Sequence, residues 1–391
     1  HQRQLYRSNR ASPELYSESQ LDIQTLLVSA LNMKASDLHL DPEESGGLIR
    51  LRIDGKLIRL KNLSIVQSKA FINQLKIAAR LDIAEKRLPQ DGRTTIKTTI
   101  GDVDARVSIL PCHYGEKAVV RLLTRSQDLL DIEKVGLSPL EYQAFQRATS
   151  RNSGLVLISG PTGSGKTTTL YASLNKMNAE HMNILTVEDP IEYTLAGINQ
   201  VQCKNEIGLD FQRILRTMLR QDPDVIMVGE IRDVETAQIA LRASLTGHLV
   251  LATIHTNSSW STIARLLDMG LPFYLILDAL SLSMAQRLIR LLCQECKQPL
   301  NHSERTFGLE IPDGTLVYGP QGCDHCYQTG YSGRKAIYEM IEFNYANRQL
   351  AKEGLSSDQR PLFVQGSLRE AAISAYFSGL TSFEEIMPYT L

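Results

Sequence analysis

The hydrophobic pattern of the chain changes part-way along its length. Before residue 123, apolar positions recur at helical spacing in two segments and alternate with polar positions in several short runs. These runs predict helices over 21–33 and around 68–79, and strands over 36–40, 48–53, 56–60, 103–109 and 118–123. From residue 155 onward, continuous apolar runs alternate with amphipathic segments, which is typical of parallel strands joined by helices. The pattern indicates a small mixed α/β domain followed by a larger α/β core.

The second region contains most of the predicted elements. Buried strands are predicted over 155–158, 184–187, 225–228 and 249–254. Helices are predicted over 140–148, 168–176, 210–220, 237–245, 262–269 and 275–292, and the remainder to Leu391 is mostly helical in pattern, notably over 367–376 and 382–387. Irregular structure is expected for the polar residues before about 20, for the turn pair Asp91-Gly92 and for a linker before residue 138.

Composition narrows the class of protein. A length of 391 residues suggests two or three domains, and 43% hydrophobic with 22% charged residues is ordinary for a globular protein. The net charge of −1 argues against nucleic acid as the main substrate, because nucleic-acid binders usually carry a basic excess. The polar start and the lack of a long apolar run predict a cytosolic protein that meets a membrane only through a partner. The first residue is His1 rather than Met, which suggests a fragment lacking an upstream domain.

The first candidate site follows the strand predicted over 155–158. Its residues are Gly160-Pro161-Thr162-Gly163-Ser164-Gly165-Lys166-Thr167, with Thr168 continuing into a helix. The stretch matches G-x-x-x-x-G-K-[ST], in which glycines let backbone N–H groups and a helix N-terminus converge on phosphate. Lys166 would reach the β- and γ-phosphates of a nucleoside triphosphate, and Thr167 would hold Mg²⁺. An ordinary glycine-rich turn is the alternative, but the full pattern in its strand–loop–helix setting favours nucleotide binding.

Three later strands end in polar residues. Glu188 follows the strand over 184–187 and could order a magnesium-bound water, act as general base, or simply terminate a turn. Glu230 follows the strand over 225–228, as in the acidic second nucleotide motif that positions metal and water. His255, after the strand over 249–254, is a candidate γ-phosphate sensor, although a lone histidine is more often structural. Ligands of open α/β sheets bind at the carboxyl ends of strands, so these side chains are expected near the nucleotide.

Two arginines occupy mirrored positions in the strand pair predicted before residue 123. A hairpin symmetric about the loop 111–116 places Arg106 directly opposite Arg121. Like charges in that arrangement cost stability, so the pair is better explained by an anion that both contact. Two solvated surface arginines are the alternative and fit the sequence equally well. A further stripe of arginines on the helix over 210–220 is of a kind that usually marks a solvated face.

Four of the six cysteines form two C-x-x-C pairs, Cys293/Cys296 and Cys323/Cys326. In a cytosolic chain such pairs indicate a metal before disulfides, and four thiolates with no open position make a structural zinc site. The second pair begins 27 positions after the first pair ends, which is long and implies an insertion between the two knuckles. His302 and His325 are conceivable replacement ligands. The isolated Cys112 and Cys203 are interpreted as structural.

Four motifs together resemble one family, the hexameric ATPases of type II secretion and type IV pilus assembly. Gly160–Thr168 is similar to its Walker A motif, and Ile184–Tyr193 (ILTVEDPIEY) is similar to its aspartate box. Asp222–Asp233 (DPDVIMVGEIRD) resembles its Walker B motif, and Thr246–Asn257 (TGHLVLATIHTN) resembles its histidine box. The two cysteine pairs also resemble the zinc-binding insert of the secretion and assembly members, which the retraction motors generally lack.

The resemblance extends from about Leu21 to Leu391 and implies a fold class and a domain order. The expected protein is α/β, with a RecA-like P-loop NTPase core, a smaller N-terminal PAS-like α/β domain, a zinc-binding insert and a helical C-terminal tail. The implied parts are a polar tether over 1–20, the PAS-like domain over 21–125, a linker over 126–137, the ATPase core over 138–292, the tetracysteine insert over 293–330 and a helical subdomain over 331–391. Members usually carry a further N-terminal domain that docks on the inner-membrane platform, and the resemblance leads us to expect that it is missing here.

The resemblance also implies roles for single residues. Arg106 and Arg121 are expected to contact the nucleotide when the small domain closes on the core. Glu230 is expected to order or deprotonate water with help from Glu188. A charge network around the site or a subunit interface is expected to include Arg216, Arg220, Arg232 and Arg265.

The implied activity is that of a homohexameric motor that hydrolyses ATP to assemble a type IV pilus or a type II secretion pseudopilus. The motor would be cytoplasmic and held peripherally at the inner membrane by a platform protein, with no nucleic acid and no direct membrane insertion. Three alternatives stay open: a pilus retraction motor, a nucleotide-gated scaffold that binds ATP without turnover, and a nucleic-acid translocase.

Overall fold

The protein forms two compact units, His1–Thr124 and Arg125–Leu391, in the computed structural model. The structure describes residues 22–98, 101–123, 130–300, 309, 311–312, 314–352 and 364–390. The tether expected over 1–20, the linker residues 126–129 and the candidate ligand His302 lie outside these residues. Within them, no helix combines the length and the apolar composition needed to cross a membrane.

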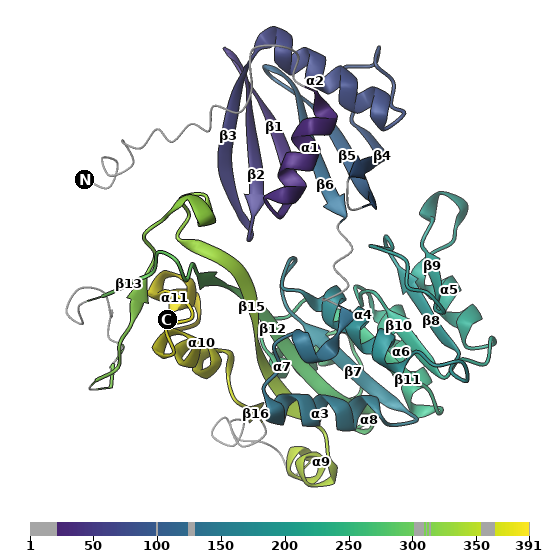
Figure 1. Cartoon of the computed structure of the whole chain (residues 1–391). Helices are drawn as coiled ribbons and strands as arrows, with labels where there is room; N and C mark the ends of the chain where they lie inside the picture. The colour runs from purple at the N-terminus through teal and green to yellow at the C-terminus, as the bar shows by residue number, and fades with distance from the viewer. Residues whose placement is uncertain are drawn as a thin grey trace. The chain divides into compact units, whose positions relative to one another are not determined.

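The first unit is a six-stranded antiparallel sheet whose helices α1 and α2 pack against it (Figure 1). The strand order is β3-β2-β1-β6-β5-β4. Alternate apolar residues of the strands meet the buried faces of both helices in one hydrophobic core. The elements are α1 Ile23–Asn32, β1 Ala35–Glu43, β2 Gly46–Ile53, β3 Lys56–Ser64, α2 Ile65–Ala78, β4 Gln90–Thr98, β5 Gly101–Cys112 and β6 Gly115–Leu123.

Two local expectations for this unit meet different outcomes. The register of β5 and β6 places Arg106 opposite Arg121, so the predicted hairpin symmetry is confirmed. The turn expected at Asp91-Gly92 is wrong, because both residues belong to β4, which pairs with β5. Gly92 is required there by packing rather than by a turn, since a Cβ would lie 2.7 Å from the carbonyl oxygen of Ala79.

The second unit is built on an eight-stranded sheet with the order β16-β15-β12-β7-β11-β10-β8-β9. The pairs from β12 to β9 are parallel, and β15 pairs antiparallel with β12 and β16. Its strands are β7 Gly154–Ser159, β8 Ile184–Glu188, β9 Asn199–Gln202, β10 Val225–Val228, β11 Leu249–Ile254, β12 Leu280–Leu292, β15 Tyr331–Glu342 and β16 Val364–Gln365. The short strands β13 Gln298–Pro299 and β14 Tyr318–Gly319 form a separate two-stranded sheet. The central strands are buried along their whole length, as expected for a sheet covered on both faces.

Helices pack on both faces of this sheet and form a separate hydrophobic core with each face. One core contains residues of α3 and α4, the other contains residues of α5, α6, α7 and α8, and α10 and α11 pack beside the long strands β12 and β15 (Figure 1). The helices are η2 Ile132–Lys134, α3 Pro139–Thr149, α4 Lys166–Met177, η3 Asn205–Ile207, α5 Phe211–Met218, α6 Val234–Leu245, α7 Ser259–Asp268, α8 Phe273–Ala279, η4 Asp324–Cys326, α9 Tyr345–Lys352, α10 Leu368–Phe377 and α11 Phe383–Thr390.

Two expectations for the C-terminal third are wrong in part. The helix expected over 275–292 ends at Ala279, and the rest is strand β12. The segment from residue 331, expected to be mostly helical, begins with strand β15, which extends the same sheet, but the helices expected over 367–376 and 382–387 are confirmed as α10 and α11. A strand that is paired on both sides and buried on both faces has no polar alternation, so its apolar run can be mistaken for a buried helix.

Candidate functional site

The phosphate-binding loop connects buried β7 to α4. Gly160, Gly163 and Gly165 all have positive φ, at 152°, 79° and 87°. A Cβ on Gly160 would lie 2.5 Å from the Ser164 hydroxyl, whereas nothing lies within 4 Å of the Cβ position of Gly163. The loop is therefore packed against the protein on one side and open at Gly163, as a phosphate cradle requires.

Lys166 and Ser164 are the polar side chains buried in this loop. The Lys166 ammonium donates to the carbonyl oxygens of Gly160 at 2.7 Å and Pro161 at 2.9 Å. Burial lowers the pKa of Lys166 to about 8, since the nearby negative charge of Glu230 offsets only part of the desolvation. The Ser164 hydroxyl is buried and has no hydrogen-bond partner among the residues that the structure describes. A polyphosphate fits these groups, because its oxygens would restore full charge to the lysine and accept hydrogen bonds.

Glu230 lies at the centre of a charged cluster beyond the end of β10. One carboxylate oxygen lies 2.8 Å from Nε2 of His255, which follows β11, and the other accepts a 2.8 Å hydrogen bond from Nε of Arg232. A second nitrogen of Arg232 lies 3.8 Å from the carboxylate of Asp189, which follows β8. The ends of three adjacent parallel strands thus bring these polar groups together, as expected for a ligand site of an open α/β sheet.

Glu188 differs from Glu230 because it is only 3% exposed and accepts hydrogen bonds from three side chains. Its carboxylate accepts hydrogen bonds from Tyr171, from Thr186 at 2.6 Å and from Gln200 at 3.1 Å. Burial and the neighbouring carboxylate raise the pKa of Tyr171, so that hydroxyl stays a donor. The environment suits a carboxylate that fixes the chain between β8, β9 and α4.

Two residues of β12 that the sequence analysis missed also pack behind the phosphate-binding loop. Gln286 accepts a 2.9 Å hydrogen bond from Thr169 of α4, and its amide nitrogen lies 2.8 Å from the Cβ position of Gly165. The neighbouring Arg287 is 9% exposed. No local motif marks them, because only the pairing of β12 with β7 brings them to the loop.

In the first unit, an ion-paired row of polar residues crosses the sheet. Arg93, Arg106 and Arg121 occupy directly opposed positions on β4, β5 and β6, and Asp37 of β1 follows Arg121 in the same row. The carboxylate of Asp37 lies 3.0 Å from Nε of Arg121. All three arginines line a cavity of about 440 Å³. The cavity has the charge and size to accept an anionic group.

The other arginines expected around the site lie on α5 and α7, in the turn after α5, or next to Glu230. Arg216 pairs with Glu235 across α5 and α6, Arg220 donates to the carbonyl oxygen of Arg216 at 2.9 Å, and Arg265 is exposed on α7. The exposed position of the α5 arginines agrees with the predicted amphipathic helix, whose buried face is Ile214, Leu215 and Met218. Of the four residues, Arg232 is the one that contacts Glu230.

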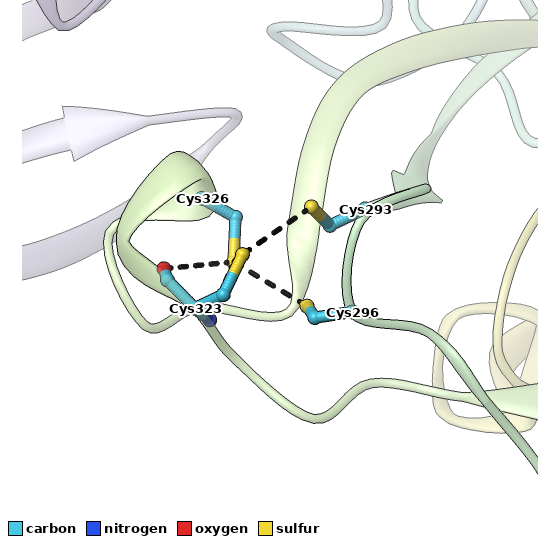
Figure 2. Close-up of side chains that lie close together, drawn as sticks. All are labelled: Cys293, Cys296, Cys323 and Cys326. Atoms are coloured by element: carbon cyan, nitrogen blue, oxygen red, sulfur yellow. Dashed lines mark hydrogen bonds between the residues drawn. The ribbon is translucent and has the colours of Figure 1, made fainter.

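The two C-x-x-C pairs converge in one cluster, in which all four sulfurs lie within 4.8 Å of one another (Figure 2). The Sγ–Sγ distances are 3.8 Å for Cys293–Cys323, 3.8 Å for Cys296–Cys326 and 3.7 Å for Cys323–Cys326. A tetrahedral site with zinc–sulfur bonds of about 2.3 Å has edges of about 3.8 Å. The donor set and its spacing therefore fit zinc, and His325 is not part of the cluster.

Backbone geometry explains how the long gap between the pairs is closed. Short strands β13 and β14, which lie inside the insertion, pair antiparallel and return the second knuckle to the first. Burial raises the pKa of Cys296 to about 12. Burial acts in the same direction on Cys326, but N–H groups of Cys323 and Gly330 donate to its sulfur and lower its pKa to about 7. Backbone N–H groups aimed at sulfur favour the thiolate that a metal needs.

The isolated cysteines have different surroundings. Cys203 is buried, and desolvation raises its pKa to about 11, which agrees with a structural role. Cys112 is exposed at the end of β5. Neither belongs to the four-cysteine cluster.

A family model described as Type II/IV secretion system protein matches residues 17–388. The chain belongs to this family. The family assignment and the expected fold class, an α/β P-loop core with a smaller N-terminal domain and a tetracysteine insert, are confirmed.

Individual members of the secretion family show the same relationship. The chain is 44% identical over 372 residues to type II secretion system protein E of Pectobacterium carotovorum subsp. carotovorum, covering 94% of this chain and 75% of the relative. It is 44% identical over 379 residues to the type IV pilus assembly ATPase PilB of Myxococcus xanthus, with coverages of 94% and 67%. The crystal structure of the pilus retraction motor PilT with bound ADP superposes with a TM-score of 0.64 at 26% identity, covering 95% of this chain and 97% of that one.

Proposed function

We propose that this protein is the motor ATPase of a type IV pilus or type II secretion system, and that it hydrolyses ATP to assemble the pilus or pseudopilus. The observation that carries the proposal is the convergence of the phosphate-binding loop, Glu230 and His255 at one edge of the sheet. The names of the two relatives at 44% identity support assembly or secretion over retraction.

The phosphate-binding loop would hold the triphosphate. Backbone N–H groups of residues 162–165 and of the first turn of α4 would donate hydrogen bonds to phosphate oxygens, because N–H groups at a helix start favour anions. Lys166 would leave its loop carbonyls for the β- and γ-phosphates, and Thr167 and Thr168 would complete the cradle. Mg²⁺, held by Thr167, would supply charge neutralisation at the β- and γ-phosphates.

Glu230 would order and deprotonate the attacking water. A carboxylate between His255 and Arg232 is held in a fixed orientation by two donors, which suits a base that must point at one water molecule. His255 would sense the γ-phosphate and transmit its presence to Glu230 through the contact between its Nε2 and the Glu230 carboxylate. Glu188 would help by fixing β8 rather than by touching water, because Tyr171, Thr186 and Gln200 already occupy its carboxylate.

The arginine row of the first unit would complete the site. Arg106 and Arg121 would offset charge that develops on the γ-phosphoryl group once the first unit closes on the core. Asp37 would keep Arg121 oriented until that point. We infer a homohexamer in which Arg216, Arg220 and Arg265 face neighbouring subunits, since all three lie exposed on the core.

The four cysteines would bind structural zinc and so close the insertion between β12 and β15. We place the protein in the cytoplasm, bound peripherally to the inner membrane by a platform protein. The zinc site favours an assembly motor over a retraction motor, and purified protein without zinc would favour the retraction motor.

Steady-state phosphate release from the purified oligomer tests the proposal. Wild-type protein should turn over ATP without stimulation by DNA. Lys166→Ala should lose both ATP binding and turnover, whereas Glu230→Gln should bind ATP and not hydrolyse it. Binding without turnover in the wild type would support a scaffold, stimulation by DNA would support a translocase, and full activity of oligomeric Glu230→Gln would rule out Glu230 as the base.

A further inference from the structure

Strand β12 places a buried cation directly behind the phosphate-binding loop. Ala285 of β12 is in register with Ser159, the last residue of β7, so the following residues run beside Gly160. The guanidinium of Arg287 is close enough that a Cβ on Gly160 would lie 3.2 Å from its Nη1. Arg287 is 9% exposed, which is unusual for arginine.

The hydrogen-bond partners of Arg287 are both backbone carbonyl oxygens. Its Nη1 donates to Gln286 at 2.9 Å, and its Nη2 donates to Asn257 at 2.8 Å. Among the described residues, no carboxylate lies within ion-pair distance of it. Arg290 on the same strand shows the usual alternative, since it pairs with Glu385 at 2.7 Å and stacks on Tyr331.

A buried guanidinium that contacts only carbonyl dipoles is poorly compensated. The pKa of Arg287 is lowered by this burial, and its positive charge acts in turn on Lys166. Glu230 attracts Lys166, while Glu339 and Tyr389 are the negative or titratable groups that act on Arg287. A different carboxylate therefore acts on each of the two buried cations near the open phosphate cradle, and an added polyanion would compensate both.

Arg287 also connects two parts of the site. Asn257, whose carbonyl it holds, lies two residues beyond His255, the partner of Glu230. Gly160 is joined to the end of β11 by a weaker 3.4 Å hydrogen bond from its N–H to the carbonyl oxygen of Ile254. The planar guanidinium of Arg287 bonds the carbonyls of Gln286 on β12 and Asn257 at once, which a lysine ammonium on a flexible stem cannot do with the same geometry.

We propose that Arg287 is a positioning residue for ATP hydrolysis, which fixes the chain after His255 relative to the phosphate-binding loop and adds buried positive charge for the triphosphate. The proposal rests on the proposed ATPase function. Arg287 would make two separate contributions. Its positive charge would raise the affinity for the nucleotide, and its hydrogen bonds to the carbonyl oxygens of Gln286 and Asn257 would raise the turnover rate.

Three substitutions of Arg287 test these contributions in the full-length, zinc-loaded oligomer. Arg287→Lys keeps the charge, so KM for ATP should stay within about two-fold of wild type while kcat falls about ten-fold, the effect of one charge-assisted hydrogen bond. Arg287→Met removes both the charge and the hydrogen bonds, so KM for ATP should rise about ten-fold and kcat should fall as well. Millimolar guanidinium chloride, compared with equal potassium chloride, should restore part of the kcat of Arg287→Ala.

Arg290→Met is the matched control, because it also removes an arginine from β12, but this half-buried side chain faces Glu385 rather than the loop. It should lower the melting temperature while kcat and KM of the folded protein stay near wild type. Wild-type kcat in Arg287→Lys, or a lower melting temperature as the only defect of Arg287→Met, would overturn the proposal. If the wild type does not hydrolyse ATP, the ATPase function fails separately, and equal affinity of the wild type and Arg287→Met for a fluorescent ATP analogue would then overturn the charge contribution.

Discussion

The lowered pKa of Lys166 predicts that nucleotide affinity falls in mildly alkaline solution. Burial lowers this pKa from the ordinary value of 10.5 to about 8, because the ammonium has left water for two carbonyl oxygens and one nearby carboxylate. Phosphate favours the charged form, so the pKa must rise when nucleotide binds. Below pH 8 the lysine is already protonated and binding is at its strongest. Above pH 8 binding must take up a proton, and affinity is lost as the pH rises.

The size of the effect follows from this proton uptake. If the complex restores a pKa of about 10.5 or more, the dissociation constant should rise about eight-fold between pH 7.5 and pH 9. Fluorescence anisotropy of a labelled ATP analogue would measure it, with melting temperature and zinc content followed at each pH.

Lys166→Met is the control, since its residual binding should be weak and nearly independent of pH over this window. The window starts at pH 7.5 so that the terminal phosphate of the nucleotide is ionised throughout. A wild-type affinity that is constant within two-fold, or that increases with pH, would show that the lysine is not held with a lowered pKa in the free protein.

Three further predictions concern stability and the division into two units. Removal of zinc with a strong chelator should lower the melting temperature and expose four reactive thiols, whereas thiol reactivity unchanged by chelation would mean that the cluster holds no metal. Gly154→Ala should destabilise the protein by about 2 kcal/mol more than Gly247→Ala, because both have positive φ but only Gly154 places a Cβ 2.1 Å from the Ser281 hydroxyl; equal melting temperatures would contradict this packing. An isolated core over 138–391 should bind ATP and hydrolyse it poorly, and wild-type turnover by that fragment would refute a role for Arg106 and Arg121.

The sequence alone predicted those parts of the site whose geometry depends on residues that are close together in the chain. The phosphate-binding loop is recognisable because glycines at fixed positions, a buried strand and a helix start are adjacent in sequence, and the structure has all three. The facing arginines Arg106 and Arg121 were predictable for the same reason, since a hairpin is local and its register follows from its loop.

Tertiary structure alone decided the contributions of β12 and β15. Their apolar runs fit a helix or a buried strand equally well, and only pairing with β7 and with each other makes them strands. The placement of Arg287 behind Gly160, more than 120 residues away in sequence, depends on that pairing and has no local signal. The same holds for Glu188, whose burial by Tyr171 and Gln200 distinguishes it from Glu230 although both end apolar strands.

The cysteine cluster combines both kinds of information. Each C-x-x-C spacing is local and predicted a knuckle that offers two sulfurs to a metal. Whether the two knuckles share one metal depended on the long insertion between them, which the pairing of β13 and β14 folds back on itself. Sequence thus determined which residues could donate to a ligand, and long-range strand pairing determined which of them meet.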